Sequence, residues 1–193
     1  MPRPKEFDRD QVLDLATDLF WKRGYEATSI GDLVDALGIG RQSLYDTFGD
    51  KHALYLAALD RYRQRHGGAV AAALESDLPL RRSMRTLFEG VIDQLLGDPQ
   101  GKTCMLVSAL AERCPDDPKV AERFCSNLQV MEQVLQRRFL RAQQEGEIAR
   151  HLEPTALARY FVNTLNGLQI TGKAIRDRRA LLEIIDVALA VLG

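Results

Sequence analysis

The sequence of 193 residues predicts an all-α fold. Apolar residues recur at the spacing of one helical face almost throughout the chain, as Val12, Ala16 and Leu19 do near its start. Glycine, proline and capping residues fall where these apolar stripes are interrupted. No run alternates apolar and polar residues between hairpin turns, so the pattern gives no indication of a β-sheet.

Four helices are predicted in the first third of the chain, each opened by a capping residue and closed by a break. The expected helices are an apolar stripe from Val12 to Phe20, Ile30–Leu37, Arg41–Phe48 and a helix that contains Leu54, Leu59 and Tyr62. The capping residues are Asp8 or Asp10, the capping-box pair Ser29 and Asp32, Gly40, and Asp50.

Longer helices are predicted after Gly67-Gly68, separated by breaks that contain glycine or proline. They are Leu80–Leu96, Cys104–Arg113, Pro118–Gln144, a helix that begins at Glu153-Pro154, and a last helix over Leu181–Leu192. This change in helix length divides the chain into two expected domains, 1–66 and 67–193.

The charge of the chain is nearly balanced, with 26 Lys and Arg against 27 Asp and Glu. Residues 1–66 hold ten basic and eleven acidic residues, and residues 67–193 hold sixteen of each. Proteins that coat nucleic acid are usually strongly basic. The balance excludes that class and leaves room for a protein that reads DNA through a few placed contacts.

Nothing in the sequence predicts secretion, a membrane span, a metal site or a cofactor. The N-terminus lacks the apolar segment of a signal peptide, and the longest apolar runs, 69–74 and 187–192, are too short to cross a bilayer. Cys104, Cys114 and Cys125 form neither a CxxC pair nor a zinc pattern. Free thiols indicate a cytoplasmic protein.

The helices 30–37 and 41–48, joined by Gly38-Ile39-Gly40, predict a helix-turn-helix. The second helix of such a unit fits the DNA major groove, where arginine can bind guanine and glutamine can bind adenine. Leu44 and Phe48 are expected to face inward. The side chains expected to face the groove are Arg41, Gln42, Ser43, Tyr45, Asp46 and Thr47. Those with donors that suit phosphate contacts are Thr28, Tyr45 and Lys51.

A longer pattern around this motif resembles a known family. It comprises Gly24-Tyr25, Thr28-Ser29-Ile30, Asp32-Leu33, Leu37-Gly38-Ile39, Leu44-Tyr45, Phe48-Gly49-Asp50-Lys51 and Leu54. Over roughly residues 8–58 it resembles the DNA-binding domain of TetR-family transcriptional regulators. The resemblance implies a homodimer, a C-terminal domain that binds a ligand, and repression that an inducer relieves. By position it implies phosphate contacts for Thr28, Tyr45 and Lys51 and groove contacts for Arg41, Gln42, Ser43 and Thr47.

The last two helices are the candidates for the dimer interface, because they combine apolar positions with small residues that allow close packing. The small residues are Ala156, Ala158, Gly167, Ala174, Ala188 and Ala190. A dimer would present two reading helices to a pseudo-palindromic double-stranded site. Arg3 and Lys5 could reach the adjacent groove, although a frayed chain end is the more ordinary interpretation.

Cys104 is the candidate sensor residue. It lies at the expected start of a helix, two residues after Lys102, and both a helix N-terminus and a cation favour the reactive thiolate. The stretch Gly101–Cys114 resembles a TetR-family branch that includes the N-ethylmaleimide-reductase repressor. The resemblance implies a cysteine that senses electrophiles, with Lys173 as a nearby lysine. The alternative is that Cys104 begins a core helix and acts as a small apolar residue.

A noncovalent effector would instead occupy an apolar pocket in the C-terminal domain. The expected lining is Phe88, Ile92, Val107, Phe124, Leu128, Met131, Phe161 and Leu165, although the same residues could form only core.

The predicted architecture is therefore an N-terminal three-helix DNA-binding domain with a helix-turn-helix, including its connecting helix (1–66), and a helical-bundle domain for effector binding and dimerisation (67–193). The predicted function is a DNA-binding transcriptional regulator, a repressor released by a small molecule or by modification of Cys104. No catalytic residues are expected. Two rivals stay open: a helical thiol peroxidase or transferase that uses Cys104, and a helical carrier or adaptor with a vestigial helix-turn-helix.

Overall fold

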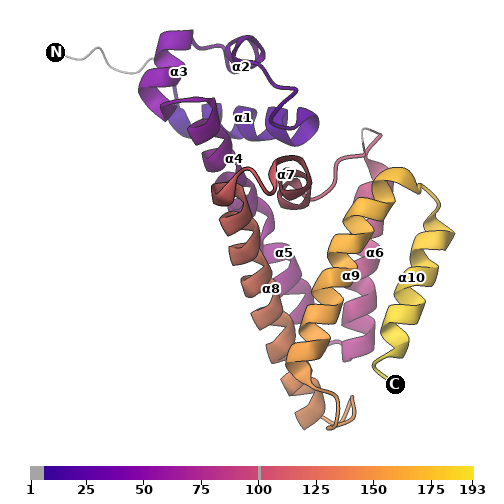
Figure 1. Cartoon of the computed structure of the whole chain (residues 1–193). Helices are drawn as coiled ribbons and strands as arrows, with labels where there is room; N and C mark the ends of the chain where they lie inside the picture. The colour runs from indigo at the N-terminus through magenta and orange to yellow at the C-terminus, as the bar shows by residue number, and fades with distance from the viewer. Residues whose placement is uncertain (1–6, 100) are drawn as a thin grey trace.

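A computed structural model of the protein describes residues 7–99 and 101–193; Arg3 and Lys5 lie outside the described residues. In the described part the fold is helical, with a small head that joins a longer bundle (Figure 1). The head comprises α1 (Arg9–Arg23), α2 (Ile30–Leu37), α3 (Arg41–Phe48) and the start of α4 (Lys51–His66). The bundle comprises α5 (Gly68–Leu74), α6 (Leu80–Gly97), α7 (Met105–Arg113), α8 (Pro118–Gln144), α9 (Pro154–Ala174) and α10 (Arg178–Ala190).

The helices of the head begin at the predicted caps. Asp8 caps α1 through its carboxylate, which accepts from the Asp10 amide at 2.8 Å. Ser29 and Asp32 form the reciprocal capping box of α2, and the Asp50 carboxylate accepts from the third residue of α4. These local contacts set the helix starts independently of tertiary packing.

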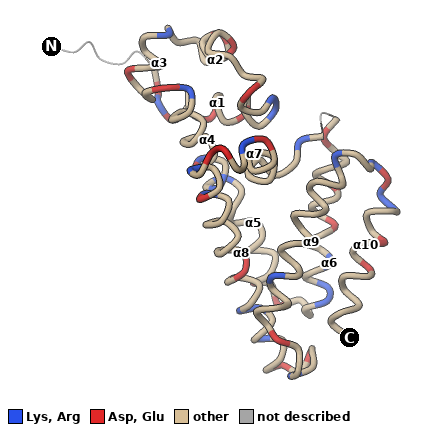
Figure 2. The backbone as a smooth tube through the Cα atoms, in the orientation of Figure 1, with Lys and Arg blue, Asp and Glu red and all other residues tan. Residues whose placement is uncertain are grey.

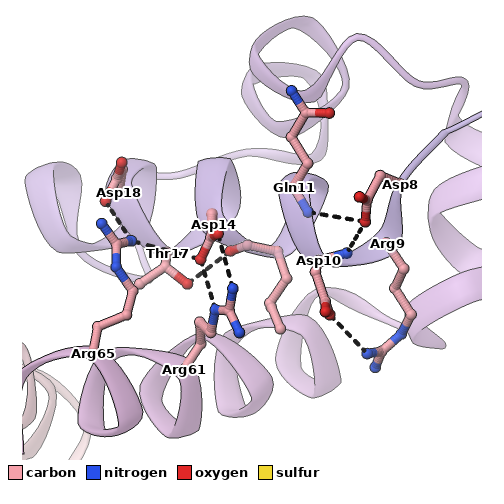
Figure 3. A network of polar contacts seen from close by, with 10 residues as sticks. Asp8, Arg9, Asp10, Gln11, Asp14, Thr17, Asp18, Arg61 and Arg65 are labelled. Atoms are coloured by element: carbon pink, nitrogen blue, oxygen red, sulfur yellow. Dashed lines mark hydrogen bonds and ion pairs between the residues drawn. The ribbon is translucent and has the colours of Figure 1, made fainter.

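Charged pairs hold α1 against α4 (Figure 3). The Arg61 guanidinium donates twice to the Asp14 carboxylate, at 2.7 and 2.9 Å, and Arg65 donates to Asp18 at 3.2 Å. The first pair uses two parallel N–H···O bonds, the arrangement that fixes orientation best. Helix α1 is thereby attached to the second half of α4, which contains both arginines.

Helix α5 was not predicted from the sequence. Gly67-Gly68 marks a break in the pattern, but Gly67 has right-handed helical dihedrals (φ −65°, ψ −24°), so the chain continues almost directly from α4 into α5. A glycine can adopt either hand, and this one continues the helical hand. The helix α4 and its continuation α5 therefore connect the head with the middle of the bundle.

The apolar core consists of two clusters, and their border differs from the predicted boundary at residue 67. One cluster fills the bundle formed by α5, α6, α8, α9 and α10. The other belongs to the head, but it also contains Met105, Leu106 and Ala109 of α7 and Val120 of α8. In packing terms α7 is thus part of the head, although it begins 39 residues after the end of α4.

Candidate nucleic-acid interface

The helix-turn-helix forms where the sequence predicts it. Gly38 ends α2 in the left-handed conformation (φ 65°), which side chains with a Cβ rarely adopt. Ile39 is buried and anchors the turn in the head's core. Gly40 begins α3 without a capping side chain. The first amides of α3 are therefore left without a side-chain acceptor, as suits a helix end that meets a phosphate.

One face of α3 packs into the head and the other faces outward. Leu44 and Phe48 are buried, as predicted. The exposed side chains are Arg41, Gln42, Tyr45 and Asp46. The Gln42 amide donates to the Asp46 carboxylate at 2.8 Å, which holds Gln42 along the exposed face. The exposed charges of α3 are one basic and one acidic, Arg41 and Asp46, and Figure 2 shows basic and acidic residues mixed along the chain of the head.

Two of the expected contact residues need correction. Thr28 is fully buried, and its hydroxyl donates to the Gly24 carbonyl at 2.7 Å, so it supports the turn after α1 and offers no donor at the surface. The Thr47 hydroxyl oxygen is buried without a partner and does not face outward. Ser43 is half-buried at the edge of the exposed face. The side chains of α3 that are ready for contact are therefore those of Arg41, Gln42 and Tyr45.

Lys51 lies at the start of α4, where its ammonium is 4.1 Å from the centroid of the Tyr25 ring. The Arg113 guanidinium also lies over this ring, at 4.6 Å. Burial raises the pKa of the Tyr25 hydroxyl above its ordinary value, and the charge of Arg113 partly offsets that rise. Cation–π contact of this kind orients the cation, and Lys51 is held at the edge of the head.

A contact that the sequence did not reveal joins α7 to the turn between α1 and α2. The Glu112 carboxylate accepts from the amides of Tyr25 and Glu26, each at 2.9 Å, and Arg113 forms an ion pair with Glu26. Gly24 has φ 83°, and a Cβ there would lie 2.9 Å from the Glu112 oxygens. We call this set of contacts the α7 clamp. Its members are far apart in sequence, and no local pattern links them.

A second connection runs from the start of α8 to α4. The His52 ring nitrogen lies 2.7 Å from the Asp117 carboxylate, which is buried. Burial raises the pKa of Asp117, but the hydrogen bonds from His52 and from the Val120 amide outweigh that effect, and the pKa falls below its ordinary value. Asp117 also caps α8. The same carboxylate thus orders a helix start and attaches it to the head.

The N-terminal end of α7 contacts the head through Trp21. The Trp21 indole donates to the Thr103 carbonyl at 2.5 Å, and the Lys102 ammonium lies 5.0 Å from the centroid of a Trp21 ring. Both ends of α7 are therefore attached to α1 or to the turn that follows it. Figure 1 shows α7 between the head and helices α6 and α9.

Cys104 is the N-cap of α7 and is half-buried at this junction. Its amide donates to the Gln169 side-chain carbonyl of α9 at 3.0 Å. Burial raises the pKa of Tyr62 on α4 far above its ordinary value. The charge of Cys104 and its hydrogen bond with Tyr62 raise that pKa further. Cys104 thus contacts a helix of the head and a helix of the bundle, whereas Cys114 and Cys125 are exposed.

The expected pairing of Cys104 with a lysine needs correction. Lys173 donates to the Ser108 hydroxyl at 3.0 Å, and that hydroxyl is also 3.0 Å from the hydroxyl of Thr103. Lys102 lies against Trp21. The Lys173 ammonium of α9 thus binds a hydroxyl of α7, and the Lys102 ammonium faces the indole of α1.

The residues expected to line an apolar pocket do not gather in one place. Phe88, Ile92, Phe161 and Leu165 are buried in the bundle core, where Leu128 and Met131 pack against them. Phe124 packs against the head's core, and Val107 is buried on α7. Two hollows at the far end of α8 are lined by other residues. The residues expected to line a pocket are instead packed in or against the two core clusters, which is the alternative interpretation of the same periodicity.

Apolar side chains are exposed along the outer faces of α9 and α10. Val187 is 70% exposed, the largest fraction among these residues. The set comprises Tyr160, Ile170, Ile175, Ile184, Val187 and Val191. Tyr160, Gly167 and Ala174 follow one another at seven-residue spacing on α9, so they share a face. A face of this kind on two adjacent helices is suited to pairing with another helical face.

The fold and the exposed recognition helix define a helix-turn-helix DNA-binding protein. No group of His, Cys, Asp and Glu side chains among residues 7–99 and 101–193 could hold a metal ion. Within the same residues, no helix is both long and apolar enough to cross a membrane.

Comparison with known proteins agrees with this class. Residues 12–58 match the model of bacterial regulatory proteins of the tetR family, and residues 79–187 match a tetracyclin repressor-like C-terminal domain. The chain is 35% identical to the uncharacterized HTH-type transcriptional regulator YezE of Bacillus subtilis, over the full length of both chains. It is 31% identical to the HTH-type transcriptional repressor ComR of Escherichia coli, covering 97% of this chain and 90% of ComR.

A solved structure of a TetR-family regulator has a similar fold over the whole chain. The TetR-family regulator CifR, determined as a cysteine mutant in complex with 26 bp of double-strand operator DNA, superimposes with a TM-score of 0.86. The two chains are 28% identical, and the superposition covers 100% of each. The protein belongs to the TetR family of DNA-binding transcriptional regulators. The thiol-enzyme alternative is not supported, because the relatives in sequence and in fold are transcriptional regulators.

Proposed function

We propose that the protein is a homodimeric repressor that binds a pseudo-palindromic operator through α3 and is released by an effector. The observation that carries the proposal is the exposed face of α3, with Arg41, Gln42 and Tyr45 outward and Leu44 and Phe48 inward. Arg41 and Gln42 have the donors that bind guanine and adenine edges in the major groove. Tyr45 and Lys51 supply donors for phosphates.

The relatives support the repressor and the operator. ComR is named a transcriptional repressor, and CifR is bound to its operator DNA. A DNA-binding protein acts where the DNA is, so we place this one in the cytoplasm. In this proposal the exposed apolar face of α9 and α10 forms the dimer, because burying it removes from water the two most exposed large apolar side chains, Val187 and Ile170.

For the sensing step we propose that Cys104 reacts with an electrophile, with a noncovalent effector as the alternative. With a maleimide, a bond forms from Sγ to one alkene carbon, the thiol proton goes to the other carbon, and nothing leaves. The added group would crowd the Cys104 side chain, which forms a hydrogen bond with Tyr62, at the junction where the Cys104 amide binds Gln169. Its displacement would pull on Thr103 and, through it, on Trp21 of α1.

Operator binding is tested by fluorescence anisotropy with DNA from the region upstream of the protein's own gene. Arg41→Ala is expected to weaken specific binding by about 1–3 kcal/mol, as loss of a bidentate base contact does. Arg150→Ala, an exposed arginine in the loop after α8, is the matched control and should leave affinity unchanged. The affinity should fall only gently with salt, since few phosphates are contacted. Equal affinity of wild type for operator and random DNA would contradict the proposal.

The sensing step is tested with two complementary cysteine variants. Cys114→Ser/Cys125→Ser keeps only Cys104, and Cys104→Ser keeps the two exposed thiols. N-ethylmaleimide should release the first variant from operator DNA and leave the second bound. Release of both, or of neither, would leave a noncovalent effector as the sensing mechanism.

A further inference from the structure

The recognition helix α3 contains a hydrogen bond between two of its own exposed side chains. The Gln42 amide donates to the Asp46 carboxylate at 2.8 Å. The two residues are four positions apart, so they lie on one face of the helix. Both are exposed, on the same side of α3 as Arg41 and Tyr45. The contact therefore involves one of the side chains to which the proposed function assigns base reading.

The stability of the helix does not explain an aspartate at position 46. Helix α3 ends at Phe48, so Asp46 lies in its last turn, where a negative charge opposes the C-terminal end of the helix dipole. Aspartate is also a weak helix former. On a helix that enters the major groove, a carboxylate repels the phosphates on either side. What the carboxylate does supply is an acceptor for the Gln42 amide.

A carboxylate acceptor determines which way round the Gln42 amide lies. An ionised carboxylate only accepts hydrogen bonds, so it binds the NH2 group of the amide and not its oxygen. With one N–H held by Asp46, the oxygen Oε1 and the second N–H are left for other partners. The reversed amide would place Oε1 against the carboxylate oxygens, acceptor against acceptor. Asp46 therefore disfavours the reversed amide.

The groups that Asp46 leaves free on Gln42 match adenine. In the major groove adenine presents its N6 amino donor and its N7 acceptor, and glutamine binds them with Oε1 and one N–H. Guanine presents two acceptors, O6 and N7, so Oε1 would face the O6 oxygen. Cytosine offers a donor without a neighbouring acceptor, and thymine offers an acceptor and a methyl group. Of the four bases, only adenine pairs with both free groups.

We propose that Asp46 is a positioning residue that restricts Gln42 to adenine, so that each half-site of the operator contains an A·T pair that Gln42 reads. This inference rests on the function proposed above, because it requires α3 to lie in the major groove. The same carboxylate lowers the affinity for DNA of any sequence, since it repels the phosphates. The hydrogen bond and the charge of Asp46 therefore have separate, measurable effects.

The base is identified by fluorescence anisotropy of the full-length protein at one fixed salt concentration. The footprinted operator is compared with a panel of operators in which each base pair is changed symmetrically in both half-sites. Wild type should lose at least about tenfold in affinity when one A·T pair becomes G·C, and Gln42→Ala should bind these two sequences within about threefold of each other. If Gln42→Ala loses its preference at no pair, or only at pairs other than A·T, the proposal is overturned.

The role of Asp46 is tested at that pair by the ratio of the affinities for the A·T and the G·C operator. Asp46→Ala should lower this ratio at least about threefold, because the amide is then free to reverse. Asp46→Asn should keep the ratio, since its side-chain oxygen still accepts from Gln42. In a Gln42→Ala background, Asp46→Ala should not change the ratio further, because both residues act through one contact. An unchanged ratio in Asp46→Ala overturns the proposal.

The charge of Asp46 is measured separately, with random DNA. Affinity for random DNA should rise at least about twofold in both Asp46→Ala and Asp46→Asn, because both remove the carboxylate charge. Asp35→Ala removes an exposed carboxylate from α2 instead and should leave the A·T to G·C ratio unchanged. A ratio lowered equally by Asp35→Ala would overturn the specific role of Asp46. Alanine favours a helix more than aspartate does, so Asp46→Ala should keep α3 folded, which circular dichroism checks.

The outcomes separate this inference from the proposed function. If wild type binds operator and random DNA equally, the proposed function fails, and the assignment of a base to Gln42 fails with it. If wild type prefers the operator and Asp46→Ala keeps the full A·T to G·C ratio, the proposed function stands and only the role of Asp46 fails.

Discussion

At the scale of single residues, the attachment of α7 to the head depends on Gly24 and on two backbone amides that follow it. Gly24 combines a positive φ of 83° with an approach of the Glu112 carboxylate. The same carboxylate accepts hydrogen bonds from the backbone amides of Tyr25 and Glu26, which follow Gly24. The sequence shows Gly24 as a helix terminator. It does not show the acidic side chain, 88 positions later, that requires this residue to be a glycine.

Gly24→Ala is therefore expected to lower the free energy of unfolding by about 1–3 kcal/mol, through strained dihedrals and the contact with Glu112. The same change in a Glu112→Ala background should cost less, because only the dihedral strain remains. Gly90→Ala is the control: this helical glycine has open space around it, and alanine there should stabilise by about 0.5–1 kcal/mol. Urea unfolding of Gly24→Ala, Glu112→Ala, the double variant and Gly90→Ala, each compared with wild type, measures these changes in stability. Equal costs of Gly24→Ala in both backgrounds would contradict the contact.

The capping box of α2 gives a pH dependence with a definite sign. Hydrogen bonds from the Ser29 hydroxyl and amide, and from Arg23, lower the pKa of Asp32 to about 2. A carboxyl with a lowered pKa stabilises the fold above its unfolded value of 3.8 and loses that contribution as the pH falls toward 2. Wild type should be more stable than Asp32→Asn at pH 7, and the difference should shrink between about pH 4 and 2. Urea unfolding at several pH values measures this; a constant difference would contradict it.

At the scale of helices, the periodicity of the sequence predicted most elements and their capping residues, because those depend on neighbours within one turn. It missed α5, because Gly67-Gly68 resembles a break and only the dihedral angles show that the helix continues. It assigned Thr28 and Thr47 to the surface, although the fold buries both hydroxyls. It left pocket lining and core open as alternatives for one set of residues, since both share one periodicity, and most of that set lies in the bundle core.

Helix α7 is the element whose role depends most on tertiary structure. Trp21, the single tryptophan of the chain, donates to the residue before Cys104 and reports on this end of α7. Alkylation of Cys104 in the Cys114→Ser/Cys125→Ser variant is expected to shift the Trp21 emission to longer wavelength, because the indole becomes more exposed to water. The Cys104→Ser protein treated in the same way should show no shift. An unchanged emission spectrum in the first variant would show that alkylation of Cys104 is not transmitted to Trp21 in the head.

At the scale of the whole molecule, the protein consists of a head, a bundle and a helix, α7, that packs with the head while contacting α8 and α9. The near-zero charge, −1, extends to the head itself, so long-range attraction to DNA is weak. Specific binding must then come from placed contacts and from the pairing of two heads. In the proposed dimer, this pairing depends on the apolar face of α9 and α10.

Val187→Asp is expected to disrupt that pairing, because it places a charge at the most exposed apolar residue of the proposed interface. Sedimentation should show a lighter species than wild type, and operator affinity should fall by at least about tenfold. Val130→Asp, on the outer face of α8, should keep both the mass and the affinity of wild type. A Val187→Asp protein that sediments like wild type would place the dimer interface elsewhere.

The central claim is that two α3 helices, held at a fixed distance by one dimer, read two half-sites of one operator. It is tested most directly by footprinting the operator upstream of the gene and then inserting about half a helical turn, about 5 bp, between its half-sites. The insertion turns the half-sites to opposite faces of the duplex. The account predicts that wild-type affinity falls to the level of random DNA. Undiminished affinity for the lengthened site would contradict it.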